Sequence, residues 1–329
     1  MTVSIIIKAL NEERHIEAAV RSALAAIGAL DGEVILADSG SSDRTIEIAR
    51  QFPITIVQLA NPAERRCGIG PQLGYQLARG RFIYILDGDM ELDAAFLPAA
   101  LAAMEAEAAL GGVGGIVEEE SRASYQFRGR QRRGDGSVAS ESKWLDMGGL
   151  YRGEALAAAG YFSNRNLHAY EEMELGLRLR AAGWKLRRLP VRGVLHHGRT
   201  EGSWVLLGRR WRSGYLDGAG ELLRASLGRP YFLRAVLTQR HLFVGLLIWL
   251  GLVAGLASLP WSRWPLMATL IAVAALIAVR AIRARSLVDA FLGQVVWQVS
   301  ALAMVRGFLA RPRDPNEPIA SRVIVPPAT

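Results

Sequence analysis

The chain has 329 residues, 51% of them hydrophobic, and its 39 lysines and arginines against 31 acidic residues give a formal net charge of +8. This length allows two domains with their own cores, while the single cysteine, Cys67, excludes an internal disulfide and suits a reducing compartment. Past residue 225 only three acidic side chains remain, so the excess charge lies beside apolar segments and favours anionic lipid over nucleic acid as its partner.

The first 90 residues contain three short apolar runs that each end in polar residues. Apolar runs bounded by turn residues predict buried parallel strands. The runs and the polar residues after them are Val3–Ala9 with Asn11, Glu33–Ala37 with Asp38, and Phe82–Leu86 with Asp87 and Asp89. In open α/β sheets ligands bind beyond the carboxyl ends of the strands, so three such ends in register predict a nucleotide pocket.

The turn Asp87-Gly88-Asp89-Met90 is the most informative of the three. Two carboxylates two residues apart can hold a hard cation and, through it, phosphate oxygens. An isolated pair of this kind is more often a solvated turn, so its weight comes from its surroundings. Among these, Asp38 ends its strand, where a carboxylate can accept a hydrogen bond from a ring N–H of a ligand.

Over most of residues 1–200 these motifs resemble the family 2 glycosyltransferases of GT-A fold. The opening strand with Asn-Glu-Glu, the Asp-x-Gly-Ser-x-Asp-x-Thr turn at 38–45, the Asp-x-Asp strand and an acidic run at 171–175 follow the family's order. The resemblance implies an α/β, Rossmann-like nucleotide-diphospho-sugar transferase domain. Within it, Asn11 and Asp38 would line the donor pocket, with Asp38 on the base, and Asp87 would bind the ribose or the metal. Asp89 would bind Mg²⁺ or Mn²⁺ on the diphosphate.

A catalytic base is expected in the acidic run, which opens a predicted helix that ends at Gly183. Acidic residues in a first helical turn are also favoured by the helix dipole, so their position alone does not indicate catalysis. By the resemblance, Glu172 corresponds to the second residue of the family's Glu-Asp pair, the general base for the acceptor hydroxyl. Glutamate stands here where aspartate is usual.

Two later features fit such a site less tightly. His196 can complete the metal's ligand set, as in some relatives, or it can be a satisfied surface histidine. Arg210 and Trp211 resemble the end of a motif of processive relatives in which arginine neutralises the leaving diphosphate and tryptophan stacks on a sugar. The arginine-rich stretch between Glu118 and Lys143 predicts a mobile loop over the site or a merely solvated one.

One rival fold is excluded by spacing. The glycines at 68, 70 and 74 invite comparison with a dinucleotide-binding loop, but the third comes one residue late and Pro71 intervenes. The preceding residues do not form a strand pattern either, so a Rossmann dehydrogenase is not indicated. In the glycosyltransferase interpretation this segment lines the donor pocket, where relatives often carry Arg-Asn in place of Pro71-Gln72.

Three apolar stretches follow the catalytic region. Residues 242–262 carry no charge and are long enough to cross a bilayer, and residues 264–282 predict the second helix of a hairpin. The flanking arginines place the catalytic domain and residues 280–285 in the cytoplasm by the positive-inside rule. The stretch 290–305 contains Gln294 and Gln298, and its crossing would put Arg306 outside. We favour a third crossing over a helix that lies in the membrane interface with Gln294 and Gln298 exposed to water.

We therefore expect a GT-A domain over 1–200, an amphipathic interfacial segment over 201–238 and two or three transmembrane helices over 239–310. The proline-rich residues 311–329 predict a flexible tail. No signal peptide is evident, which predicts a multi-pass inner-membrane protein whose catalytic domain stays in the cytoplasm.

The predicted function is an inverting, metal-dependent transfer from a nucleotide sugar to a lipid-linked or polysaccharide acceptor at the cytoplasmic membrane face, of the kind used in exopolysaccharide and cell-envelope synthesis. A processive synthase is one alternative, supported by Arg210-Trp211 but weakened because no span precedes the catalytic region. A non-catalytic membrane scaffold is another, motivated by the departures at Glu172 and Pro71-Gln72. No nucleic-acid partner is expected, because no zinc-finger or helix-turn-helix pattern occurs.

Overall fold

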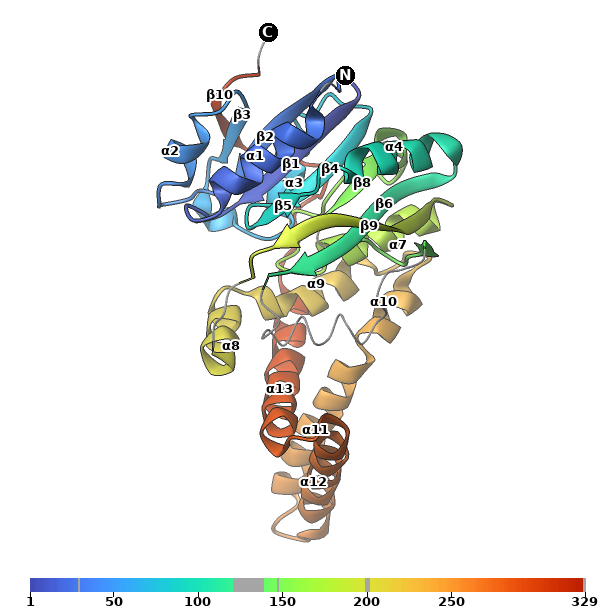
Figure 1. Cartoon of the computed structure of the whole chain (residues 1–329). Helices are drawn as coiled ribbons and strands as arrows, with labels where there is room; N and C mark the ends of the chain where they lie inside the picture. Colours follow the sequence, from blue (N-terminus) through green and yellow to red (C-terminus); the bar gives the residue numbers. More distant parts are fainter. Residues whose placement is uncertain (29, 121–138, 147, 199–201, 328–329) are drawn as a thin grey trace. The chain divides into compact units, whose positions relative to one another are not determined.

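The computed structural model describes residues 1–28, 30–120, 139–146, 148–198 and 202–327, and its chain divides into two compact units (Figure 1). The first unit comprises Met1–Glu201 with Pro312–Thr329, and the second comprises Gly202–Arg311. The arginines of the loop predicted between Glu118 and Lys143 lie outside the described residues.

The first unit is built on a mixed sheet with the strand order β10-β3-β2-β1-β4-β8-β6-β9-β5, in which β7 pairs with β9. The strands are β1 Val3–Ala9, β2 Gly32–Asp38, β3 Thr55–Leu59, β4 Phe82–Asp87, β5 Met90–Leu92, β6 Leu110–Glu119, β7 Ser140–Glu141, β8 Gly149–Arg152, β9 Lys185–His196 and β10 Ser321–Val325. The helices are α1 Ile16–Ile27, α2 Thr45–Ala49, η1 Pro62–Glu64, α3 Ile69–Tyr75, α4 Phe96–Ala106, α6 Gly153–Ala158 and α7 Glu171–Ala181.

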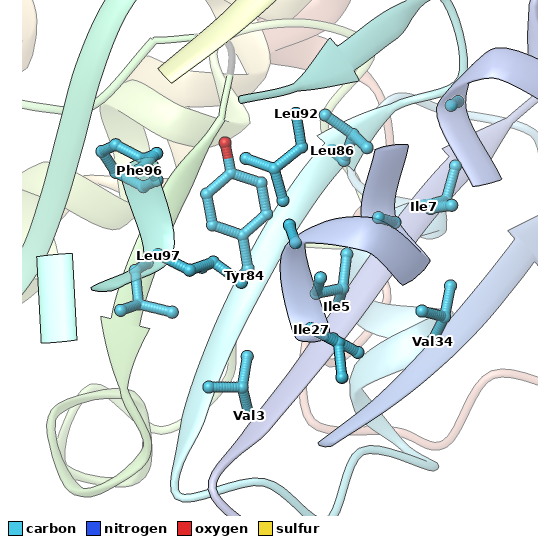
Figure 2. Close-up of a cluster of buried hydrophobic side chains, with 14 of the residues drawn as sticks. Val3, Ile5, Ile7, Ile27, Val34, Tyr84, Leu86, Leu92, Phe96 and Leu97 are labelled. Atoms are coloured by element: carbon cyan, nitrogen blue, oxygen red, sulfur yellow. The ribbon is translucent and has the colours of Figure 1, made fainter. Parts of the chain in front are cut away.

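Helices cover both faces of this sheet, as its alternating side chains require. Ile5 and Ile7 of β1 belong to a core that includes residues of α1 and α4, and Figure 2 shows part of this cluster with Tyr84 and Phe96. Ile6 points to the opposite face and belongs to a second core with residues of α3 and α7. Apolar side chains therefore cover both faces of the sheet, and polar groups lie at its edges.

The three central strands run parallel and in register, which confirms the predicted α/β fold. Ala9 at the end of β1 pairs with Asp38 at the end of β2, and Lys8 pairs with Asp87 at the end of β4. The carboxyl ends of β2, β1 and β4 therefore meet at one edge of the sheet. This is the edge at which ligands bind in open α/β folds.

The prediction of a flexible tail over 311–329 is wrong. Residues 321–325 form β10, which pairs antiparallel with β3, Ser321 opposite Leu59. Ahead of it, Ile319 is 3% exposed, and the side-chain amide of Gln76 both accepts from its N–H at 2.6 Å and donates to its carbonyl at 3.2 Å. The prolines of the tail lie on either side of the strand and none within it, whereas Val-Ile-Val inside it has high β-propensity and completes a sheet edge.

The second unit is helical. Its elements are α8 Ser203–Arg212, η2 Tyr215–Asp217, α9 Gly218–Ala225, α10 Phe232–Thr238, α11 Arg240–Ala257, α12 Trp264–Ala284 and α13 Leu287–Leu309. Three of them, α11, α12 and α13, are long and apolar enough to cross a membrane. Small residues allow these helices to pack closely, as in membrane proteins. A Cβ added at Gly255 of α11 would lie 2.6 Å from the Cα of Leu266 on α12.

Candidate active site

Asp38, at the end of β2, has one carboxylate oxygen fully used and one without a partner. Its Oδ2 accepts from the N–H groups of Gly40 at 2.8 Å and Ser41 at 2.9 Å and from the Gln58 amide at 3.0 Å. Its Oδ1 is buried and has no hydrogen-bond partner within the described part of the chain. Buried polar atoms are rarely left unpaired, and the predicted contact of this oxygen with a ligand N–H stays a prediction.

Asn11 supports the loop that carries Asp38. It adopts a left-handed conformation with φ of 56°, which asparagine tolerates better than most residues. Its Oδ1 accepts from Ser42 N–H at 2.8 Å, and its own N–H donates to Ser41 Oγ at 2.8 Å. The side chain therefore ties the turn after β1 to the turn after β2, and its predicted contact with a donor stays a prediction.

Lys8 is a site residue that the sequence analysis missed. Its Nζ lies 3.1 Å from Asp87 Oδ1 and 3.2 Å from Glu171 Oε1. Burial alone would lower the pKa of Lys8, but the charges of Asp87, Glu171 and Glu172 outweigh burial and hold it well above its usual range. Lys8 is therefore a fixed positive charge between the end of β4 and the start of α7. The available signal was that Lys8 is the one charged residue of β1.

Asp89 and His196 face each other across the pairing of β5 with β9. His196 Nε2 lies 3.5 Å from Asp89 Oδ2, and His196 Nδ1 lies 2.8 Å from Glu119 Oε2. His196 is 7% exposed, so it is not the surface histidine of the alternative interpretation. Burial would raise the pKa of Asp89, but the hydrogen bond and charge of His196 outweigh it and hold the pKa below its ordinary value.

Asp89 and His196 lie at a separation that suits two ligands of one divalent cation. Adjacent ligands of an octahedral Mg²⁺ at about 2.1 Å lie about 3 Å apart, close to the separation of Asp89 Oδ2 and His196 Nε2. Glu119 holds the other ring nitrogen, as carboxylates commonly do for metal-binding histidines. Asp87 is instead paired with Lys8. No cluster of three or more such side chains occurs in the described ranges, so water or ligand oxygens would complete the shell.

Glu172 lines a small pocket that is open to solvent. The pocket is lined by Lys8, Pro71, Ile85, Tyr151, Phe162, Ser163, Glu171, Glu172 and Leu175. Burial raises the pKa of Glu172 to about 8, Lys8 opposes this shift, and the charges of Glu171, Asp87 and Asp146 reinforce it. A carboxyl with a pKa near neutrality suits a general base. Asp38 and Asp89 are not among the lining residues.

Arg210 and Trp211 lie on α8 of the second unit. The Arg210 guanidinium stacks 4.8 Å from the ring centroid of Tyr215, and the Trp211 ring lies 4.2 Å from the Arg306 guanidinium. Both side chains therefore take part in contacts within their own unit. Their predicted contact with a donor stays a prediction.

Two family models match the chain. The model described as glycosyl transferase family 2 matches residues 4–153, and the model described as glycosyl transferase family group 2 matches residues 82–283. No curated protein sequence matches it significantly.

Solved structures share the fold at low sequence identity. The mannosyltransferase PcManGT from Pyrobaculum calidifontis, in complex with GDP-Man and Mn²⁺, is 18% identical with a TM-score of 0.57, over 93% of this chain and 85% of that chain. S. aureus TarS 1-349 in complex with UDP-GlcNAc is 15% identical with a TM-score of 0.54, over 94% and 93%. Against a longer S. aureus TarS structure, the match spans only 44% of that chain.

Proposed function

The chain belongs to glycosyl transferase family 2 and so uses nucleotide-sugar donors, and on this basis we propose that it is an inverting transferase in which Glu172 is the general base. The single observation that carries the proposal is the pocket that holds Glu172 beside Lys8. Purified protein should turn over a nucleotide sugar with Mn²⁺ or Mg²⁺ and extend a membrane-extracted acceptor. Absence of turnover with every common nucleotide sugar would favour the scaffold alternative.

In the proposed reaction, Glu172 and Lys8 have different roles. Glu172 takes the proton of the acceptor hydroxyl, whose oxygen attacks the anomeric carbon on the face opposite the diphosphate. The bond from that carbon to the diphosphate breaks, and the configuration is inverted. Lys8 steadies the carboxylates on both sides of the pocket, since it contacts Asp87 and Glu171.

A divalent cation, when bound by Asp89 and His196, would neutralise the charge that develops on the leaving diphosphate. Asp89 suits this role because its pKa is held low, so it is ionised at neutral pH. The pairing of Asp87 with Lys8 leaves Asp87 better suited to the ribose hydroxyls than to the metal.

The contacts of Asp38 favour a uridine donor. Its Oδ2 already accepts three hydrogen bonds, so a base meets only Oδ1. One acceptor matches the single N3–H of uracil, whereas guanine presents an N–H and an amino group side by side and is best met by two acceptors. We therefore propose UDP as the nucleotide of the donor.

Asp38→Ala should weaken UDP binding by about tenfold to a hundredfold, because a hydrogen bond to a charged group contributes about 1.5–3 kcal/mol. Titration calorimetry with UDP and GDP measures this directly. Glu47→Ala, which removes an exposed carboxylate on neighbouring α2, is the matched control and should bind UDP normally. Tighter binding of GDP than UDP, or unchanged UDP binding by Asp38→Ala, would contradict the assignment.

We further propose that only two of the three apolar helices cross the membrane. The chain leaves the first unit at Glu201 and returns to it at Pro312, and β10 then pairs with β3 of the same sheet. Strands of one sheet lie on one side of a bilayer, so the number of crossings between those residues must be even. The hairpin of α11 and α12 is the natural pair. Arg306 and its neighbours then stay on the catalytic side, as the positive-inside rule requires.

Cysteine labelling tests this topology. In a Cys67→Ser background, Ser262→Cys in the turn after α11 should react with a membrane-impermeant maleimide on intact cells. Ser286→Cys and Arg311→Cys, before and after α13, should react only once the cells are opened. Labelling of Arg311→Cys from outside would instead support the third crossing that the sequence favours.

A further inference from the structure

A cluster of polar side chains lies among the three apolar helices of the second unit. The side chains are His241 of α11, Arg280 of α12, and Gln294, Trp297 and Gln298 of α13. Gln294 is 4% exposed, and its Oε1 accepts from Arg280 Nη1 at 3.2 Å. Among the residues that the structure describes, its buried Nε2 has no hydrogen-bond partner, and neither has the Nε2 or the Oε1 of Gln298.

Aromatic contacts fix the basic groups of this cluster. The Arg280 guanidinium lies over the Trp297 ring, 3.3 Å from its centroid, and the His241 ring lies 5.2 Å from the same ring. Trp249 Nε1 donates to the Gln298 carbonyl at 3.2 Å and holds that turn of α13 against α11. Three helices thus position one guanidinium beside two amides whose N–H groups have no acceptor in the described parts of the chain.

The chemistry of the cluster matches an anion. A guanidinium, an imidazole and two amide groups supply donors, while the only acidic residue of these three helices, Asp289, is exposed in the first turn of α13. Polar groups inside apolar helices are costly to leave unpaired and often mark binding sites. A phosphate, with several acceptor oxygens, would accept hydrogen bonds from the Nε2 groups of Gln294 and Gln298.

The depth of the cluster points to a lipid. Arg280 lies four residues, or about 6 Å, from the end of α12, and His241 is the second residue of α11. These helix ends carry Arg240, Arg283 and Arg285 and form the arginine-rich end of the proposed hairpin. We infer that the cluster binds the phosphate group of a lipid at headgroup level, an inference that rests on the proposed hairpin topology and on no catalytic residue.

The test uses the full chain purified in a neutral detergent, with bound lipid measured by native mass spectrometry and by thermal shift. The probes are phosphatidylglycerol, an isoprenyl phosphate, diacylglycerol without phosphate, and inorganic phosphate. Both phosphate lipids should be tested, because a bulk phospholipid and a lipid-linked acceptor share this chemistry. The tighter of the two identifies the source, whereas diacylglycerol should not bind.

Arg280→Gln should weaken binding of the phosphate lipid by about tenfold or more, and Gln294→Leu should weaken it severalfold. Arg283→Gln removes the same charge from an exposed position on the same helix and should bind normally. Equal losses in Arg280→Gln and Arg283→Gln would overturn the site in favour of diffuse surface attraction. Unchanged binding by Gln294→Leu would show that the amide is only an internal packing contact.

Nucleotide binding separates this inference from the proposed function. All three variants should bind UDP as the unchanged chain does, since none lies in the first unit. A chain that binds lipid phosphate through Arg280 but no nucleotide sugar would remove the transferase proposal and leave this site standing. The reverse outcome would remove only the site.

Discussion

Glu172→Gln is expected to stop sugar transfer while leaving donor binding unchanged. Loss of a general base lowers kcat by about 10²–10⁴-fold, and glutamine keeps the size of the side chain in the pocket. Single-turnover transfer measures the effect, with UDP affinity measured on the same preparation. Glu171→Gln is the matched comparison, because it removes a neighbouring carboxylate that pairs with Lys8 but leaves the base in place.

The pH profile gives this prediction a second measurement. Only ionised Glu172 can take a proton, and its pKa is about 8, so kcat/KM should fall about tenfold for each pH unit below that value and level off above it. A flat profile between pH 6 and about 8, or a Glu172→Gln variant with normal transfer, would contradict the assignment of the base.

The same shift predicts an effect on stability. Because the folded pKa of Glu172 is raised from 4.5 to about 8, the folded state keeps a proton that the unfolded chain has lost between these values, and the free energy of unfolding falls as pH rises through this range. Glutamine does not titrate, so Glu172→Gln removes this pH-dependent fall in the free energy of unfolding. Its unfolding temperature should therefore exceed that of the unchanged protein at pH 8 and approach it near pH 5.

Asp89→Asn is expected to have the second large effect, through the metal. Loss of a charged ligand should abolish Mn²⁺ binding measured in the presence of UDP, together with the Mn²⁺-dependent rate. Glu119→Gln, which disturbs only the orientation of His196, should lower metal affinity by about 10–100-fold.

Asp31→Asn is the control for Asp89→Asn, since Asp31 precedes β2 at the opposite end of the sheet and pairs with the chain's amino group. It should leave metal affinity and rate unchanged. Transfer that persists in Asp89→Asn and in excess chelator would remove the metal from the proposed mechanism.

The sequence predicts the central strands and the helix of Glu172 because their signals are local. An apolar run bounded by turns specifies a buried parallel strand, and the acidic first turn with Gly183 after the helix fixes both ends of α7. The register of β1 with β2 and β4 follows from the same pattern, since each strand's end is marked by a polar residue.

What the sequence leaves open depends on contacts between distant segments. Lys8 meets Glu171 across 163 positions, and Glu119 meets His196 across 77. No spacing rule links such pairs, because the sheet order that brings them together is set by the packing of the whole domain. The same holds for β10, whose partner strand lies more than 250 residues earlier, and for the polar cluster assembled from α11, α12 and α13.

The pairing of β10 with β3 also orders events during synthesis. The ribosome makes the three apolar helices before it makes β10, so β3 remains an open edge until all three have been synthesised. An unpaired edge strand invites pairing with other chains, and a chaperone that shields it would act in this interval. Closure of this edge can therefore occur only after all three apolar helices have been made, so it is a late step in folding.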